Sequence, residues 1–219
     1  MTGLDEIERW ARAEFETRNA AREQALSQSR ELIRTCANTI RAVHRRDFEQ
    51  ARTLLARAKE LSDGLTRNLG PYPDLFYTGY VQDAQKEYVE ATATLSLVSG
   101  SPMPPPQELG IAAAPFLNGL AETVGELRRF VLDKLRRGEL EGSEALLQTM
   151  DDIYSLLVTI DYPDALTGGL RRTTDAARGI LERTRGDLTF ALRQQELETS
   201  LARVEQQIQR TLRGSENGA

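Results

Sequence analysis

Apolar residues near the start of the chain recur at three-, four- and seven-residue steps. This spacing places them on one helical face and predicts an amphipathic helix that ends at about Arg46. The positions are Leu4, Ile7, Ala11, Phe15, Leu26, Ile33, Ile40 and Val43. Strand-type alternation of apolar and polar residues reaches no convincing length in the sequence. The pattern therefore predicts an all-α fold.

Turn and capping residues divide the next part of the chain. Asp47 has the chemistry of a helix N-cap and predicts a second helix that closes within residues 64–70, where glycines and prolines gather. A third helix is expected over about residues 74–98. The proline-rich residues 101–106 then predict a stiff connector.

Three further helices are expected in the second half of the chain. One carries Glu122 and ends near Gly138, and the next is capped by Ser143 and ends before residues 162–163. The expected buried stripe of that second helix is Leu146, Leu147, Met150, Ile153, Leu157 and Ile160. The last helix begins after the glycines at 168–169 and ends in a row of apolar residues spaced almost as in a coiled coil. The row is Leu197, Leu201, Val204, Ile208 and Leu212.

These elements predict one domain over residues 1–213, a bundle of about six or seven antiparallel helices, with a frayed tail at residues 214–219. Of the 219 residues, 40% are hydrophobic and no apolar run approaches the ~20 residues of a membrane span. The chain starts with an acidic amphipathic segment, unlike a secretory signal, so we expect a cytoplasmic location and no membrane partner.

Charge and rare residues exclude several chemistries. The net charge of -5 argues against a globally basic nucleic-acid binder but allows a local basic stripe. A single cysteine, Cys36, excludes an intrachain disulfide and a zinc site of several thiolates. His44 is the one histidine, and it lies eight residues from Cys36 on the same expected helix, too far for a thiolate dyad. Glycine-rich phosphate-binding motifs are absent from the sequence.

Paired glutamates are the remaining candidate for chemistry. Glu87 and Glu90 are spaced i,i+3, and Glu122 and Glu126 are spaced i,i+4, so each pair projects from one helical face. Oxygen-only ligands favour Mg²⁺ or Mn²⁺, whereas a di-iron helix would have histidine at the position of Glu90. The alternative is that these glutamates lie on ordinary solvated faces.

Three segments resemble the translin family. Residues 83–91, Asp-Ala-Gln-Lys-Glu-Tyr-Val-Glu-Ala, resemble the catalytic helix of translin-associated factor X and its archaeal relatives. Residues 116–128 look like the family's second acidic motif, and residues 30–45 look like its first helix. The resemblance implies an all-α protein that forms a hollow, octamer-like homo-oligomer and binds single-stranded RNA or DNA. In the factor-X branch it also implies RNA cleavage with Mg²⁺.

Carried onto this sequence, Glu87, Glu90 and Glu126 match glutamates of the two catalytic motifs. Glu122 stands where active members usually have aspartate. The implied function is an endoribonuclease that depends on Mg²⁺ or Mn²⁺ and cleaves single-stranded RNA. The four carboxylates would hold the metal, which activates water for attack on the phosphodiester. Single-stranded DNA is chemically allowed as a substrate. One alternative is a non-catalytic single-strand-binding oligomer like translin. A second is a helical scaffold that binds only protein.

Basic and aromatic residues near the acidic motifs are candidates for nucleic-acid binding. They are Arg41, His44, Arg45, Arg46, Tyr80, Arg128 and Arg129, with Lys134, Arg136 and Arg137 further along the same expected helix as Arg128. The alternative for the basic residues is a solvated or salt-bridged helix face. Tyr88, Cys36 and Trp10 are expected to pack in the core. The apolar row from Leu197 to Leu212 is the candidate contact between copies.

Overall fold

The chain forms helices and no strand across the residues that the structure describes. A computed structural model describes residues 3–216, with side chains described as far as residue 210. The long helices are α1 (Gly3–His44), α2 (Phe48–Leu69), α4 (Gly79–Val98), α6 (Ala113–Arg136), α7 (Ser143–Leu157) and α9 (Leu170–Glu216). Three single turns complete this range: α3 (Pro73–Phe76), α5 (Pro106–Leu109) and α8 (Asp164–Thr167). The predicted all-α fold is confirmed.

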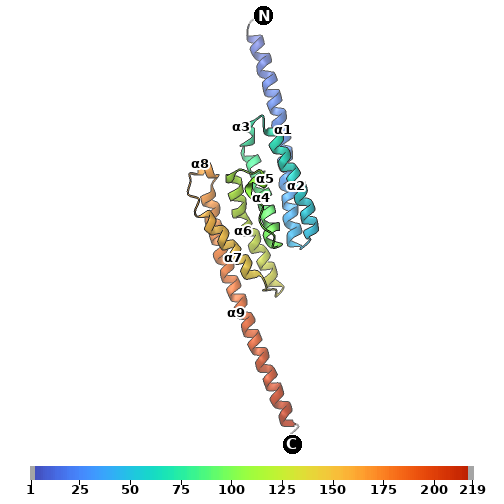
Figure 1. Ribbon diagram of the computed structural model, residues 1–219, viewed down its shortest axis with the longest axis vertical. Coiled ribbons are helices and arrows are strands. Elements are labelled where there is room, and N and C mark those ends of the chain that lie inside the picture. The colour runs from blue at the N-terminus through green and yellow to red at the C-terminus, as the bar shows by residue number, and fades with distance from the viewer. Residues whose placement is uncertain (1–2, 217–219) are drawn as a thin grey trace.

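Four of the long helices, α1, α4, α6 and α9, run in the same direction (Figure 1). Two hydrogen bonds between α6 and α9 show this direction. Thr173 donates to Asn118, and Arg128, ten residues further along α6, donates to Thr184, which lies further along α9. Helices α2 and α7 run the opposite way and return the chain, whereas the connector at residues 99–112 carries it back between α4 and α6. The expected antiparallel arrangement therefore holds for α2 and α7 but not among these four.

Several predicted boundaries hold and others shift. Asp47 caps α2, and its carboxylate accepts a hydrogen bond from the Gln50 amide at 3.1 Å. The second helix closes within residues 64–70, as predicted, because α2 continues through the buried Gly64 and ends at Leu69. The expected helix over 74–98 is broken between α3 and α4.

The fifth predicted helix starts and ends at different residues from those expected. It begins at Ser143, but Gly142 in a left-handed conformation is its N-cap and the serine makes no capping bond, so the predicted cap is wrong. The expected stripe does reach the core through Met150, Ile153 and Leu157. The helix ends at Leu157, earlier than predicted, and Ile160 packs on the core from the following loop.

The main core lies between α1, α2, α4, α6, α7 and the first half of α9. Helix α4 is its centre, because twelve of its residues are buried. Tyr88 and Cys36 pack in this core, as expected. Helix α4 therefore carries Glu90 into the interior of the bundle.

Both ends of the chain project from the body as single helices (Figure 1). We define the N-terminal arm as residues 3–17 of α1 and the C-terminal arm as residues 189–210 of α9. The arms expose apolar side chains, since Trp10 is 69% and Leu197 is 59% exposed. The expectation that Trp10 packs in the core is therefore wrong.

Two predictions at the C-terminus fall partly on residues that the structure does not describe. The side chain of Leu212 lies outside the described side chains, as do residues 217–219 of the predicted tail, whereas residues 214–216 belong to α9. None of the helices in residues 3–216 has the length and apolar character that crossing a bilayer requires.

Candidate metal centre

A glycine fixes the approach of α6 to α4. A Cβ atom added to Gly119 would lie 2.5 Å from the Lys86 carbonyl oxygen and 2.9 Å from the Cβ of Val89. A side chain at this position would therefore push the two backbones apart, so the contact requires glycine. Because Glu122 lies one turn further along α6, this contact places its carboxylate against the acidic face of α4.

Three carboxylates meet at this helix pair. One carboxylate oxygen from each of Glu87, Glu90 and Glu122 lies within 4.8 Å of the others. We call these three residues the acidic trio. Glu90 is the most deeply placed, at 9% exposure. No other group of three or more His, Cys, Asp or Glu side chains among the described residues brings its ligand atoms this close together.

Burial and mutual repulsion change the protonation of the acidic trio. Burial is the main cause that raises the pKa of Glu90 from 4.5 to about 8, and the charges of Glu87, Glu122 and Glu126 add to it. The pKa of Glu87 is also raised, chiefly by burial and then by Glu122. In the absence of a cation the site therefore resists carrying its full negative charge.

Lys86 is the cation of this site. Its ammonium nitrogen lies 2.8 Å from Oε1 of Glu122, and it reaches across from α4 to α6. Burial alone would lower the pKa of Lys86, but the hydrogen bond and charge of Glu122 outweigh burial and the pKa is raised. Lys86 therefore stays protonated beside the acidic trio.

Glu126 is the fourth predicted ligand, and it has a different partner. Its Oε2 atom contacts Nε2 of His44 at the end of α1. The His44 side chain is only 5% exposed, and its Nδ1 atom is buried without a hydrogen-bond partner. The structure thus groups three of the four predicted glutamates and holds the fourth one helical turn away, against His44.

The donor set fits a hard divalent cation. The acidic trio supplies oxygen ligands, which Mg²⁺ and Mn²⁺ prefer. Clustering these carboxylates in a half-buried site costs free energy that a divalent cation would offset, and the raised pKa values of Glu87 and Glu90 reflect this cost. The residues present therefore suit a magnesium or manganese site.

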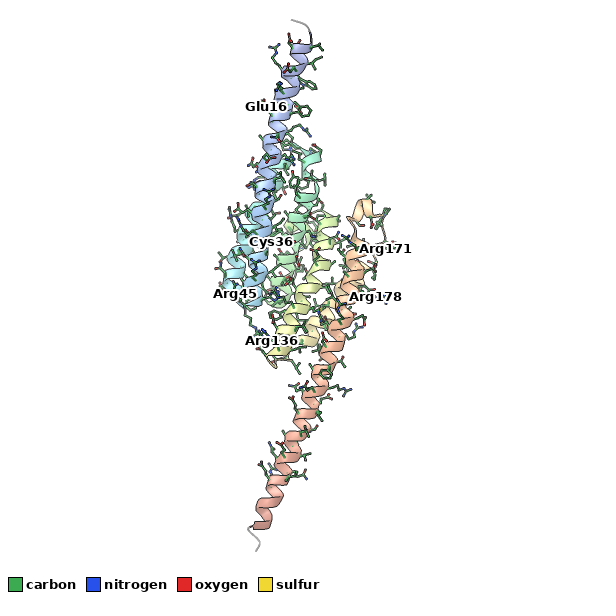
Figure 2. All side chains as sticks on the ribbon, turned by 180° about the vertical axis from the view of Figure 1, so that it is seen from behind. Glu16, Cys36, Arg45, Arg136, Arg171 and Arg178 are labelled. Atoms are coloured by element: carbon green, nitrogen blue, oxygen red, sulfur yellow. The ribbon has the colours of Figure 1, made fainter. Side chains whose placement is uncertain are left out.

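The first predicted basic group lies at the end of α1 that faces this site. Arg45 is exposed there, and Figure 2 shows it at the same end of the body as Arg136 of α6. The guanidinium of Arg41 donates to Asn38 at 2.8 Å, and that of Arg46 pairs with Glu139. Arg45 has no acidic partner among the described residues and is the freest of the three.

Arginines on α6 are more constrained. Arg128 pairs with Asp187 at 2.8 Å and donates to Thr184 at 3.1 Å, so it ties α6 to α9. Arg129 is exposed and lies 3.8 Å from Glu126. Beyond them, Arg136 pairs with Asp133. Their role in nucleic-acid binding stays a prediction.

Two further arginines were missed by the sequence interpretation. Arg30 and Arg34 are exposed on α1 and have no acidic partner among the described residues. Together with Arg41 and Arg45 they fall within about 60° of the helix circumference, at ~100° per residue. We call these four residues the arginine stripe. Their i, i+4, i+11, i+15 spacing is the signal that would have identified them.

Tyr80 does not stand free near the site. Its ring packs against the main core, and its hydroxyl is buried without a hydrogen-bond partner. Base stacking by Tyr80 would require a change in its surroundings. Cys36 lies close enough to Glu87 and Glu90 for their charges to act on it, and burial followed by these charges raises the pKa of its thiol. The thiol is therefore neutral.

No protein-family model matches the chain. An uncharacterized protein of Methanocaldococcus jannaschii is 32% identical over 191 residues, which cover 86% of this chain and 84% of the relative. The structure of AfC3PO in complex with duplex RNA matches with a TM-score of 0.78 at 37% identity, over 84% of this chain and 95% of AfC3PO.

The chain belongs to the translin family. A second structure of AfC3PO gives the same TM-score at 36% identity over the same shares of the two chains. Apo-NeC3PO, at 20% identity, supports the fold alone, with a TM-score of 0.76 over 87% of this chain and 98% of that chain. The predicted resemblance of this chain to the translin family is thereby confirmed.

Proposed function

We propose that this translin-family chain is a Mg²⁺-dependent endoribonuclease that cleaves single-stranded RNA, with Mn²⁺ as an alternative metal. The observation that carries the proposal is the acidic trio, which converges from α4 and α6 in a half-buried site. The match to AfC3PO, whose solved complex contains duplex RNA, supports an RNA substrate. Single-stranded DNA is chemically allowed, because activation of water does not require a 2′-hydroxyl.

The acidic trio would hold the divalent cation, and Glu126 is one helical turn away. A divalent cation in such a site activates water and neutralises charge on the phosphodiester. Glu90 contributes by its burial, which keeps one side of the site away from solvent. His44 contributes by holding Glu126 in position at the edge of the site.

The arginine stripe supports the binding of a strand. Its four arginines run from Arg30 to Arg45, just past the end of α1, about 22 Å at ~1.5 Å per residue, which is long enough for several phosphates. The stripe ends beside His44, whose ring contacts Glu126. A strand that follows α1 would therefore be led to the acidic trio.

A homo-oligomer, octamer-like and hollow as in the family, is part of the proposal. The exposed apolar residues of the C-terminal arm, Leu197, Leu201, Val204 and Ile208, form a row that suits packing against another helix. The N-terminal arm has a comparable exposed row, formed by Leu4, Ile7 and Phe15. Burying such rows between copies would remove apolar surface from water.

Cleavage of labelled RNA tests this function. The purified protein is incubated with single-stranded RNA, single-stranded DNA or duplex RNA, in Mg²⁺ or in EDTA. We expect Mg²⁺-dependent cleavage of single-stranded RNA that is lost in Glu87→Gln/Glu90→Gln and retained in Glu198→Gln, an exposed glutamate of the C-terminal arm. Binding of RNA without cleavage by the wild type would instead support the non-catalytic alternative.

A further inference from the structure

The ion pair of Lys86 engages an oxygen of the acidic trio that a divalent cation would need. Lys86 lies on α4 directly before Glu87, and its ammonium contacts Oε1 of Glu122 at 2.8 Å. The ammonium group donates a hydrogen bond to this oxygen, so it must move away before a metal can bind the same atom. Glu122 therefore has two competing partners, the lysine of its own chain and a divalent cation.

Lys86 has room to leave this position. Its side chain is 23% exposed, so the ammonium is within reach of solvent. Asp83 lies one turn earlier on the same face of α4 and is exposed, and its charge already acts on Lys86. The lysine can thus exchange Glu122 for Asp83 and water by rotation of its flexible side chain.

We propose that Lys86 is a built-in counter-cation that stabilises the metal-free site and competes with the divalent cation for Glu122. The proposal rests on the proposed function, because it assumes that the acidic trio is a metal site. It assigns Lys86 a positioning role that limits metal affinity. When Glu122 exchanges Lys86 for a divalent cation, the freed ammonium lies at the mouth of the site, where a phosphodiester would meet it.

Metal affinity measures the competition directly. Calorimetric titration with Mn²⁺ compares the wild type with Lys86→Met, Lys86→Arg and Lys134→Met, the last as a control for removing one positive charge elsewhere. We expect Lys86→Met to bind Mn²⁺ about 5-fold tighter or more, as for a typical coupling between two ligands of one site. Lys86→Arg and Lys134→Met should stay close to the wild type.

Thermal unfolding separates competition from a structural role. Without metal, Lys86→Met should have a lower Tm than the wild type, because Glu122 loses its counter-charge. With saturating Mn²⁺ this difference should disappear, whereas a merely structural role would lower both Tm values equally. If Lys86→Met does not fold without metal, Lys86→Gln replaces it, and recovery of helical circular dichroism on adding Mn²⁺ is the expected result.

Two results would overturn the role of Lys86, and they differ in what they mean for the metal site. Mn²⁺ binding by Lys86→Met that is no tighter than binding by Lys134→Met would overturn the role of Lys86 while leaving the metal site intact. Failure of the wild type and all variants to bind Mn²⁺ would overturn both the inference and the metal site of the proposed function.

Discussion

The acidic trio and the two arms show opposite departures from the usual distribution of polar and apolar residues. Between α4 and α6 the bundle encloses carboxylates, whereas the arms expose Trp10, Phe15 and the row that begins at Leu197. Buried charge and exposed apolar surface both cost free energy when unpartnered. Each region therefore suits a partner, a cation at the first and an apolar surface at the second.

The partner differs because the local structure differs. The acidic trio sits where Gly119 lets two backbones approach closely, so its three carboxylates lie near enough to share one small ion. Each arm is a single helix, open on all sides, and suits another helix along its length. The proposed metal site thus lies at the centre of the molecule, and the proposed contacts between copies lie at its ends.

The largest effect is expected from closing the space at Gly119. Gly119→Ala places a Cβ 2.5 Å from the Lys86 carbonyl oxygen, so α4 and α6 must separate. We expect a loss of about 3 kcal/mol in the free energy of unfolding and weakened Mn²⁺ binding. Chemical denaturation and calorimetric titration provide the two measurements.

Gly125→Ala is the matched control on the same helix. The nearest side-chain atom to its added Cβ is Cδ1 of Ile180, at 3.8 Å, so the methyl group fits. Replacing a helical glycine by alanine should leave stability unchanged or raise it by up to about 1 kcal/mol. Equal destabilisation by both substitutions would show that the close approach at Gly119 has no special role.

The pH dependence of stability tests the buried charge of the acidic trio. Because the pKa of Glu90 is near 8 when folded and 4.5 in its ordinary state, the folded protein binds more protons between these pH values. Metal-free stability should therefore fall as pH rises through this window, by up to about 1.4 kcal/mol per pH unit. Denaturant unfolding from pH 5 to pH 9 measures this slope.

Glu90→Gln should flatten that slope, because the amide does not titrate. The variant should be more stable than the wild type at pH 9 in EDTA, whereas the exposed-site control Glu198→Gln should keep the wild-type slope. Saturating Mn²⁺ should remove the slope of the wild type, since metal binding requires ligands that are deprotonated in the folded state, as they are in the unfolded chain over most of this window. A wild-type slope that is unchanged by Glu90→Gln would contradict the assigned pKa.

Charges placed on the C-terminal arm test its role in assembly. Leu197→Asp/Leu201→Asp should reduce the particle mass measured by light scattering, because carboxylates would be buried between helices. Helix content should change little, since both side chains are exposed in the single chain. The control Gln195→Asp/Thr199→Asp changes the opposite face of the same helix. A mass that is unaffected by the leucine substitutions would exclude this row as the contact.

The smallest effect is expected from the arginine stripe. Arg30→Gln/Arg34→Gln should lower the slope of log affinity against log salt by roughly 0.7 per lost contact with a single strand. Fluorescence anisotropy with a labelled RNA gives this slope. Arg52→Gln/Arg57→Gln on α2, where both arginines pair with glutamates, is the control. Equal slopes for the two double variants would remove the stripe from the binding surface.

Local features of the sequence predicted much of this fold. The cap at Asp47 and the start of the last helix after residues 168–169 follow from short-range chemistry. The end of α2 at Leu69 falls within the predicted residues 64–70, although Gly64 itself lies inside the helix, because a glycine can also continue a helix that is buried against a neighbour. The break between α3 and α4, and the left-handed Gly142 before α7, depend on tertiary packing that periodicity does not report.

The candidate site was predictable in composition but not in arrangement. Helical spacing and family resemblance identified Glu87, Glu90, Glu122 and Glu126. The spacing could not show that His44, eighty-two residues away in sequence, would contact Glu126, or that Lys86 would contact Glu122. Such partners follow from how three helices pack together, and they decide which carboxylates face one another.

The location of a bound cation tests the central claim most directly. Crystals of the protein soaked in Mn²⁺ and measured at a wavelength near the manganese absorption edge would show each bound ion as an anomalous peak. We expect a peak enclosed by the carboxylates of Glu87, Glu90 and Glu122. A map with no peak there, or with manganese only elsewhere on the protein, would contradict this claim.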